Sequence, residues 1–328
     1  MELEMRIGSA SILDVMRGPL GRCAALFLAA VCLLARGESP TGDAVVRARA
    51  GESEIVITTT ARLAGAIHSL TWNGKEFINS SDHGRQLQSA CSFDNSADVG
   101  AETFNPREAG SRLDGAGPQS SSRLLELLTQ GNRLRTSTQM AFWLAPGERS
   151  EGQLARNTKT LSDYLLTKDV RIGYGRWSQA LDYSVTFTVP AGARHTSAQF
   201  EALTGYMPAE FERFWQFNPS SGRLEPLSDG PGEIARPVVL ATADGRYAMG
   251  IYAPPHPQPH TAPPRYGRWR FQAEKVVKWN CVFRVEYKEG LAPGDYTYRM
   301  LVPIGSFGDV EAMLRDWIER DKVSSTRG

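Results

Sequence analysis

The stretch "VVKWNCVFRVEY", residues 276–287, alternates apolar and polar side chains. One set is Val277, Trp279, Cys281, Phe283, Val285 and Tyr287; the other includes Lys278, Asn280, Arg284 and Glu286. Alternation with a period of two over this length predicts a half-buried antiparallel β-strand. The stretch "LDYSVTFTVP", residues 181–190, repeats the pattern and predicts a second strand of the same kind.

Similar short runs extend in both directions from these two stretches. They are residues 54–60, 63–72, 85–93, 133–145, 161–172, 196–205, 237–243, 246–253 and 295–303. Clusters of Gly, Pro, Asn and Asp separate them and supply turn chemistry. Many short strands without a fixed-period repeat predict an all-β sandwich or barrel and not βαβ units.

The end of the chain has a different period. In "DVEAMLRDWIERDK", residues 309–322, Val310, Met313, Leu314, Trp317 and Ile318 recur at helical spacing. Acidic residues begin the stretch and basic residues end it, which suits the helix dipole. This pattern predicts a C-terminal helix that packs on the sheets.

The beginning of the chain has the layout of a secretory signal peptide. An apolar run of 13 residues, 23–35, follows Arg17 and Arg22 and precedes small and polar residues. Residues 1–37 are therefore predicted to be a signal peptide, and residues 44–328 a single β domain that is secreted or periplasmic. The alternative for the apolar run is a buried core helix. No later apolar run is long enough to predict a membrane span in the mature chain.

Charge and cysteine content narrow the function classes. The formal net charge is +1, which gives no electrostatic footprint for nucleic acid. Outside the signal only Cys91 and Cys281 remain, and either a disulfide or two core thiols fit them. The sequence has no Cys/His cluster, P-loop, dinucleotide fingerprint, Gly-x-Ser-x-Gly elbow or HExxH. We expect no metal site and no cofactor.

Residues 65–88, "GAIHSLTWNGKEFINSSDHGRQLQ", resemble the start of the galactose mutarotase-like family of carbohydrate-active proteins. Gly84 and Arg85 align with a Gly-Arg pair that brings an Arg to the sugar site in that family. The Asn-Arg dipeptide that follows in aldose epimerases is Gln88–Ser89 here, and their His-Gly-Gly segment is absent. The resemblance implies an antiparallel β-supersandwich with a sugar-facing surface, and not an epimerase mechanism.

The same stretch holds the first candidate site residues. His83 and Arg85 are predicted to be catalytic, and Gln86 and Gln88 to bind substrate, because sugar hydroxyls need such donors and acceptors. Alternation separates these two pairs onto opposite faces unless a bulge intervenes. The competing interpretation is a solvated strand end with a surface pair between Arg85 and Asp82.

A long polar loop, residues 94–122, supplies a second set. Glu102 and Glu108 are predicted as a carboxylate pair for acid–base work on a glycosidic bond, with Asn105 binding substrate. An ordinary polar loop is the alternative. Asp94 and Asp98 lack the spacing of an EF-hand calcium site.

Four more residues are predicted to bind substrate. Trp215 suits a sugar platform or the core, and His256 lies in the Pro-rich loop 253–268. Lys278 and Asn280 share the polar face of a strand, which lines a groove or merely meets water. The sequence thus predicts an exported enzyme, of glycoside hydrolase or lyase type, that acts on a polysaccharide or oligosaccharide. The alternative is a non-catalytic carbohydrate-binding or cell-wall-associated protein.

Overall fold

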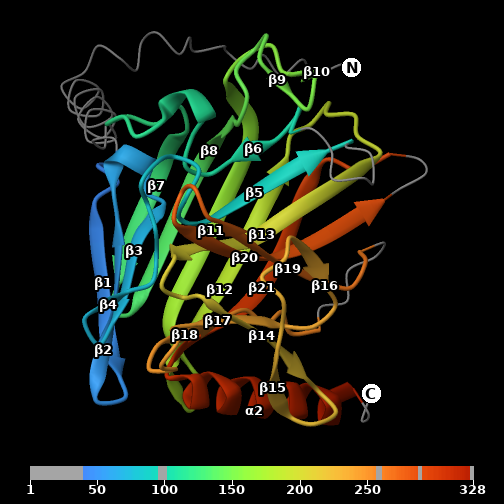
Figure 1. Cartoon of the computed structure of the whole chain (residues 1–328). Helices are drawn as coiled ribbons and strands as arrows, with labels where there is room; N and C mark the ends of the chain where they lie inside the picture. The colour runs from blue at the N-terminus through green and yellow to red at the C-terminus, as the bar shows by residue number, and fades with distance from the viewer. Residues whose placement is uncertain (1–39, 95–101, 256–260, 287–289, 326–328) are drawn as a thin grey trace, which may run out of the picture. The chain divides into compact units, whose positions relative to one another are not determined.

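The computed structural model describes residues 40–94, 102–255, 261–286 and 290–325. Pro40–Gly328 form one compact unit, in which antiparallel strands build two layers (Figure 1). The predicted signal peptide and His256 lie outside the described residues. None of the helices within the described ranges is long and apolar enough to cross a membrane.

The first layer contains the candidate site. In order of pairing its strands are β1 (Ala44–Ala50), β2 (Ser53–Thr59), β3 (Ile67–Trp72), β5 (Leu87–Phe93), β13 (Ser197–Pro208), β20 (Val276–Glu286), β19 (Arg265–Phe271) and β16 (Gly232–Ile234), with β4 (Lys75–Glu76) paired to β3. Short 3-10 turns, η2 (Ala61–Leu63) and η3 (Arg112–Asp114), lie in the connections.

The second layer packs behind the first. Its strands pair in the order β7 (Arg123–Gln130), β8 (Arg133–Phe142), β11 (Leu161–Tyr174), β12 (Trp177–Val189), β21 (Gly294–Gly305), β18 (Ala248–Gly250), β17 (Val238–Ala241), β14 (Arg213–Asn218) and β15 (Arg223–Pro226). The short strand β6 (Pro106–Arg107) pairs with both β5 and β8 and so joins the layers. β9 (Arg149–Ser150) and β10 (Gln153–Leu154) form a separate hairpin.

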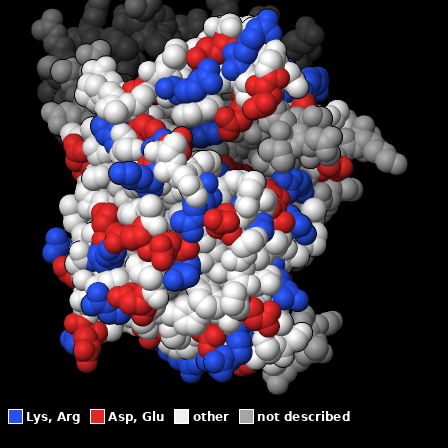
Figure 2. All heavy atoms as spheres, in the orientation of Figure 1, with Lys and Arg blue, Asp and Glu red and all other residues white. Residues whose placement is uncertain are grey.

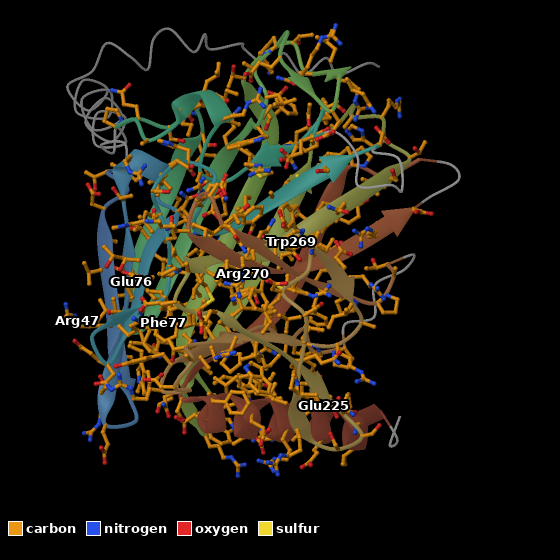
Figure 3. The ribbon with its side chains drawn as sticks, viewed as in Figure 1. Arg47, Glu76, Phe77, Glu225, Trp269 and Arg270 are labelled. Carbon is orange, nitrogen blue, oxygen red and sulfur yellow. The ribbon has the colours of Figure 1, made fainter. Side chains whose placement is uncertain are left out.

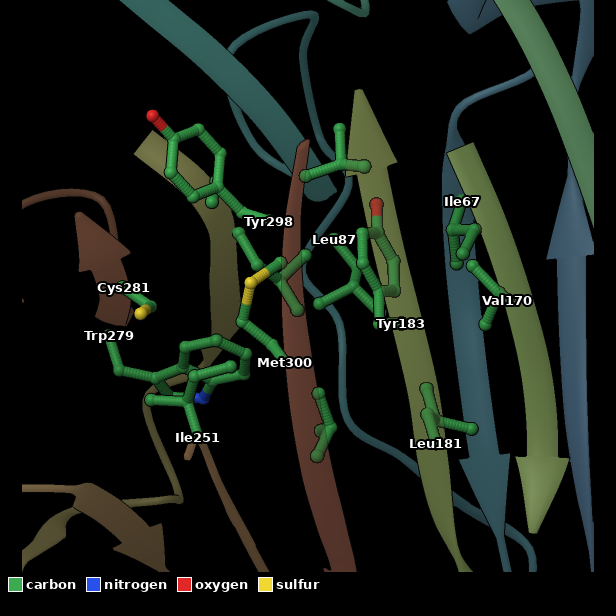
Figure 4. Packing of buried hydrophobic residues seen from close by; sticks show 14 of the residues in the cluster. Ile67, Leu87, Val170, Leu181, Tyr183, Ile251, Trp279, Cys281, Tyr298 and Met300 are labelled. Carbon is green, nitrogen blue, oxygen red and sulfur yellow. The ribbon is translucent and has the colours of Figure 1, made fainter. Parts of the chain in front are cut away.

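The core lies between the layers. Trp279 and Cys281 of β20 and Leu87 of β5 pack with Tyr183 of β12 and Met300 of β21 (Figure 4). The apolar members of the predicted alternations point into this core, as Val277, Trp279, Cys281 and Val285 do from β20. The prediction of an all-β antiparallel supersandwich with a C-terminal helix is confirmed.

The C-terminal helix α2 (Phe307–Ser325) covers the end of the second layer. It begins with a reciprocal cap, because Ser306 N–H donates to the Asp309 carboxylate at 3.0 Å and Asp309 N–H donates to Ser306 Oγ at 3.2 Å. Its predicted apolar stripe, including Trp317, packs in a cluster with residues of β14, β17 and β21.

Cys91 and Cys281 are free thiols buried in the core. They lie on β5 and β20, which are separated by β13: Cys91 is opposite Phe200, and Cys281 is opposite Leu203. Of the two interpretations left open by the sequence, plain core residues are correct. Burial raises the pKa of both thiols, which keeps them protonated.

Candidate functional site

The surface of interest is the side of β5, β13, β20 and β19 that faces away from the core, here called the polar face. Strand register brings its residues together, because directly opposed residues in antiparallel pairs share a face. One row runs Gln88, Thr204, Asn280 and Gly267 across the four strands, and a second runs Tyr206, Lys278 and Trp269. In Figure 3, Trp269 lies in the region where Figure 1 labels these strands.

The centre of the polar face is an ion pair between Lys278 and Glu201. Lys278 Nζ lies 2.8 Å from Glu201 Oε1, and these side chains are 13% and 17% exposed, so the pair is shielded but reachable from solvent. Asn280 Nδ2 donates to the same Glu201 oxygen, while its Oδ1 accepts the Gly267 N–H at 2.9 Å. The carboxylate is therefore held by two side chains of the neighbouring strand β20, one of which is itself fixed by β19.

Two aromatic rings flank the ammonium group. Lys278 Nζ lies 5.1 Å from the centroid of Tyr206 and 4.7 Å from that of Trp269, both within cation–π range. Trp269 folds over Gly267, where an added Cβ would stand 2.1 Å from the indole ring. Gly267 thus allows the indole to lie beside the ion pair.

These contacts hold both charges fixed. Burial on its own would raise the pKa of Glu201, but the charge of Lys278 and hydrogen bonds from Lys278 and Asn280 outweigh it and lower the pKa to about 2. For Lys278, burial lowers the pKa, yet the charge of Glu201 raises it above its usual range. Near neutral pH, Glu201 is a carboxylate acceptor and Lys278 an ammonium donor.

Below this pair the floor of the polar face has unused hydrogen-bonding capacity. Gln88 Oε1 and Thr204 Oγ1 are buried and have no hydrogen-bond partner among the described residues, and the same is true of Gln86 Oε1. Their neighbouring amides are used, since Gln88 Nε2 donates to Gly84 O at 2.8 Å and Gln86 Nε2 donates to Asp82 O. Buried polar atoms normally have a hydrogen-bond partner, so these oxygens suit a site where a ligand or a water molecule supplies the missing partner.

Arg107 of β6 extends the polar face. Its Nε donates to Asn105 Oδ1 at 2.7 Å, its terminal nitrogen pairs with Glu102, and its guanidinium lies 4.1 Å from the Trp143 centroid. Burial on its own would lower the pKa of Arg107, but the charges of Glu102, Tyr206 and Glu201 outweigh burial, so the pKa lies above its usual value. Arg107 is thus electrostatically coupled to both Tyr206 and Glu201.

The structure therefore unites part of the predicted site and separates the rest. Gln88, Lys278 and Asn280 belong to the polar face, and the Gln86 carbonyl adjoins it by accepting the Tyr206 N–H at 3.2 Å. Glu102 and Asn105 reach it through Arg107. Glu108 lies on the core side, where it is fully buried, pairs with Lys168 and accepts the Ser89 N–H at 3.1 Å. Glu102 and Glu108 thus do not face one another as a carboxylate pair.

The other predicted residues have local partners. His83 is buried, and its two ring nitrogens each lie 2.8 Å from a backbone carbonyl, of Gly115 and of Arg62, so neither is presented to a ligand. Arg85 lies 3.4 Å from Asp82 and donates to Ser81, which is the surface pairing that the sequence offered as the alternative. Trp215 packs on Phe307, the first residue of helix α2.

A second polar cluster lies at the end of β5. His195 Nδ1 is 2.6 Å from Asp94, and His195 Nε2 contacts the Tyr164 hydroxyl. Burial raises the pKa of Tyr164 above its usual range, so the phenol stays protonated. With both ring nitrogens occupied and His195 stacked on Phe93 at 4.4 Å, this cluster holds the chain together and offers no free acid or base. Within the described residues, Asp94 belongs to no group of three or more His, Cys, Asp or Glu side chains that could hold a metal ion.

Sequence reasoning missed Glu201, Thr204, Tyr206 and Trp269. Glu201 belongs to the predicted strand 196–205, yet nothing local showed that its carboxylate would meet Lys278, some 77 positions later (278 minus 201). Trp269 directly follows the predicted Pro-rich loop 253–268 and belongs to no predicted strand. The available signal was the spacing of Gly267 and Trp269, two positions apart on what proved to be one strand face.

Comparisons with known proteins give structural likenesses only. No family model matches the chain, and no curated protein matches it. Solved structures that match include an alpha-galactosidase from Lactobacillus brevis, with 9% identity and a TM-score of 0.43, covering 82% of this chain and 40% of that one. A heparan sulfate lyase from Pedobacter heparinus matches with 10% identity and a TM-score of 0.39, covering 82% and 36%.

A third match is a protein described as a putative aldose 1-epimerase from Klebsiella pneumoniae, with 12% identity, a TM-score of 0.41 and 84% of each chain covered. The chain spans well under half of the galactosidase and of the lyase. At these TM-scores and identities the likenesses assign no activity.

Proposed function

We propose that this chain is an exported carbohydrate-active protein that takes a polysaccharide or oligosaccharide onto the polar face, as an enzyme of glycoside hydrolase or lyase type. One observation carries the proposal: the Lys278–Glu201 pair is fixed between the rings of Tyr206 and Trp269. Sugars present hydroxyls, which need charged or amide partners, and apolar ring faces, which pack on aromatic side chains.

The floor of the polar face supports this proposal. Gln88 Oε1 and Thr204 Oγ1 are the unpaired polar atoms that a hydroxyl-rich ligand, or the water it displaces, would satisfy. Asn105 and Arg107 add an amide and a guanidinium at one end. Export rests on the sequence of residues 1–37 alone.

The second candidate is a non-catalytic carbohydrate-binding protein, and one observation favours it. General acid–base catalysis works best with a group whose pKa lies near the working pH. The pKa of Glu201 is lowered to about 2 and that of Lys278 is raised, so neither group changes its charge near neutrality. An enzyme at this site would need Tyr206 or Glu102 to move the proton.

A panel of polysaccharides separates these candidates. Release of reducing ends alone supports a hydrolase, and absorbance from unsaturated uronate supports a lyase. Binding without either product supports the non-catalytic candidate, and the absence of both binding and products rejects a carbohydrate function. N-terminal sequencing of the exported protein tests the signal peptide, with a start between about residues 36 and 44 expected.

A variant locates the site. Trp269→Ala should weaken glycan binding at least tenfold, because it removes the aromatic neighbour of Lys278. Trp177→Ala is the matched control, since Trp177 is also partly exposed but donates to Asp316 of helix α2, away from the polar face. Equal losses in the two variants would place the site elsewhere.

A further inference from the structure

Three basic side chains on and around the polar face each have an acidic partner. Lys278 lies 2.8 Å from Glu201, Arg107 pairs with Glu102, and Arg284 lies 2.8 Å from Glu233. Arg284 also donates to Gln199 at 2.7 Å. The cations are therefore neutralised within the protein before any ligand arrives.

The surrounding surface shows the same balance. Basic and acidic side chains are interspersed over the face seen in Figure 2, without a large patch of one sign. Arg265, which donates to the Glu233 carbonyl, lies at the far end of β19, where it lines a cavity of about 640 Å³ together with Arg284 and Tyr266. Arg268, the sequence neighbour of Trp269, has its guanidinium engaged by the carbonyls of Ser228 and Gly232, so a bound polyanion would meet no row of unpaired cations there.

Glu201 supplies the negative charge at the centre of the polar face. Its carboxylate neutralises Lys278, contacts Asn280 and lies in the electrostatic field of Arg107. An anionic sugar that approached Lys278 would have to displace this carboxylate or lie against it, and like charges in a shielded site repel strongly. A neutral sugar would instead donate hydroxyls to Glu201 and accept from Lys278 without disturbing the pair.

We propose that the polar face selects neutral glycans over anionic ones, and that Glu201 is the residue that sets this selectivity. The inference rests on the proposed carbohydrate function of the same face. It adds the charge class of the ligand and the residue responsible. It also disfavours a uronate-cleaving role for this face, since such a role needs a cation free to neutralise the carboxylate.

The test uses pairs of oligosaccharides of equal length and linkage, one neutral and one carrying a carboxylate at C6. Suitable pairs are gluco- with glucurono-, galacto- with galacturono- and manno- with mannurono-oligosaccharides. Calorimetry on the full chain should show at least tenfold tighter binding of the neutral member in the pair that binds. Equal or tighter binding of the anionic member overturns the inference while leaving the carbohydrate function standing. Binding of no pair, and of no glycan in the panel above, rejects the carbohydrate function itself.

The variant Glu201→Gln keeps the shape of the side chain and removes its charge. The ratio of the dissociation constants of the anionic and the neutral member should fall at least tenfold, because Lys278 is then free to bind a carboxylate. Glu126→Gln is the matched control: it makes the same charge change at a surface pair with Arg135 on the other layer, and should leave the preference within threefold. An unchanged preference in Glu201→Gln overturns the role given to this residue.

A measurement on the unaltered protein covers the case in which Glu201→Gln does not fold. Binding that neutralises no ligand charge is nearly insensitive to salt, whereas binding of an anion by basic side chains weakens as ions screen it. The dissociation constant of the preferred oligosaccharide should change less than twofold between low and high sodium chloride. A steep weakening with salt overturns the inference.

Discussion

Two of the Glu–Lys pairs in the described residues have the same chemistry in opposite surroundings. Lys168 and Glu108 lie inside the core with no exposed side-chain surface, whereas Lys278 and Glu201 lie on the polar face and are 13% and 17% exposed. The core pair is enclosed, and Glu108 is further anchored by the Ser89 N–H. The outer pair adjoins aromatic rings and unpaired buried oxygens. The comparison teaches that the charges of an ion pair do not by themselves indicate a ligand site. What indicates one is the set of groups around the pair that a ligand can reach.

The largest expected effect comes from breaking the core pair. Lys168→Met leaves Glu108 buried without a counter-charge and should lower the free energy of unfolding by about 3–5 kcal/mol. Urea unfolding followed by tryptophan fluorescence measures this. Adding Glu108→Gln to the same variant should recover much of the loss, because the uncompensated charge is gone. A single variant within about 1 kcal/mol of the wild type would show that the pair is not enclosed as described.

The next largest effect is the loss of stability at acid pH that comes from the Lys278–Glu201 pair. The pKa of Glu201 is about 2 in the folded chain and its ordinary value is 4.5, so the folded state binds this proton less readily. The resulting stabilisation is present above about pH 4.5, is lost as pH falls toward 2, and is worth at most about 3 kcal/mol. Roughly 2 kcal/mol of it should disappear by pH 3.

Glu201→Gln cannot show this titration, so its deficit in unfolding free energy relative to the wild type should shrink as pH falls from 6 to 3. Urea unfolding at several pH values measures the difference. Other carboxyls whose pKa is lowered, including Asp94 and Glu148, are common to the two proteins and cancel. A deficit that stays constant with pH would mean that the Lys278–Glu201 contact does not persist in solution.

The same contrast shows what the sequence was able to predict. Period-two alternation predicted that Lys278 and Asn280 share a face and that Trp279 and Cys281 point into the core, and both are confirmed. Local pattern carries no information about register, so it gave no indication that Glu201 would meet Lys278 or that Thr204 would stand opposite Gln88. Those contacts depend on strands that are far apart in sequence.

Other misses have local causes. The sequence predicts no strand over β19: its first residues, 265–268, fall in the predicted Pro-rich loop, and Arg265, Gly267, Arg268 and Arg270 dilute its alternation. In the structure this strand closes the polar face beside β20. Glu108 was assigned to a solvent-facing rim because its neighbours in sequence are polar. Its partner Lys168 interrupts the apolar side of β11 between Leu166 and Val170, and that interruption was the available signal for a buried pair.

A smaller effect on stability is expected from replacing Arg85, the residue that aligns with the sugar-site Arg of the galactose mutarotase-like family. Its guanidinium is partly exposed and contacts Asp82 at 3.4 Å and Ser81, an arrangement worth little in water. Arg85→Ala should therefore change the free energy of unfolding by less than about 1 kcal/mol. Its glycan affinity, measured beside that of Trp269→Ala, decides the catalytic assignment: a tenfold loss supports it, and an unchanged affinity shows that the motif around Gly84 serves only the fold.

The smallest expected effect is that of a reducing agent on the melting temperature. It tests whether the two core thiols are as enclosed as the core ion pair. Strand β13 separates Cys91 from Cys281, and both thiols are buried and protonated, so neither a bridge nor ready oxidation is expected. The melting temperature should be the same with and without a reductant, because no closed loop constrains the unfolded chain. In denaturant without reductant, a maleimide should label both cysteines of the mature protein, while the native protein should label slowly, since the reagent must wait for the core to open. A single mass corresponding to two unlabelled, oxidised cysteines would show that β5 and β20 lie closer together than the register through β13 allows.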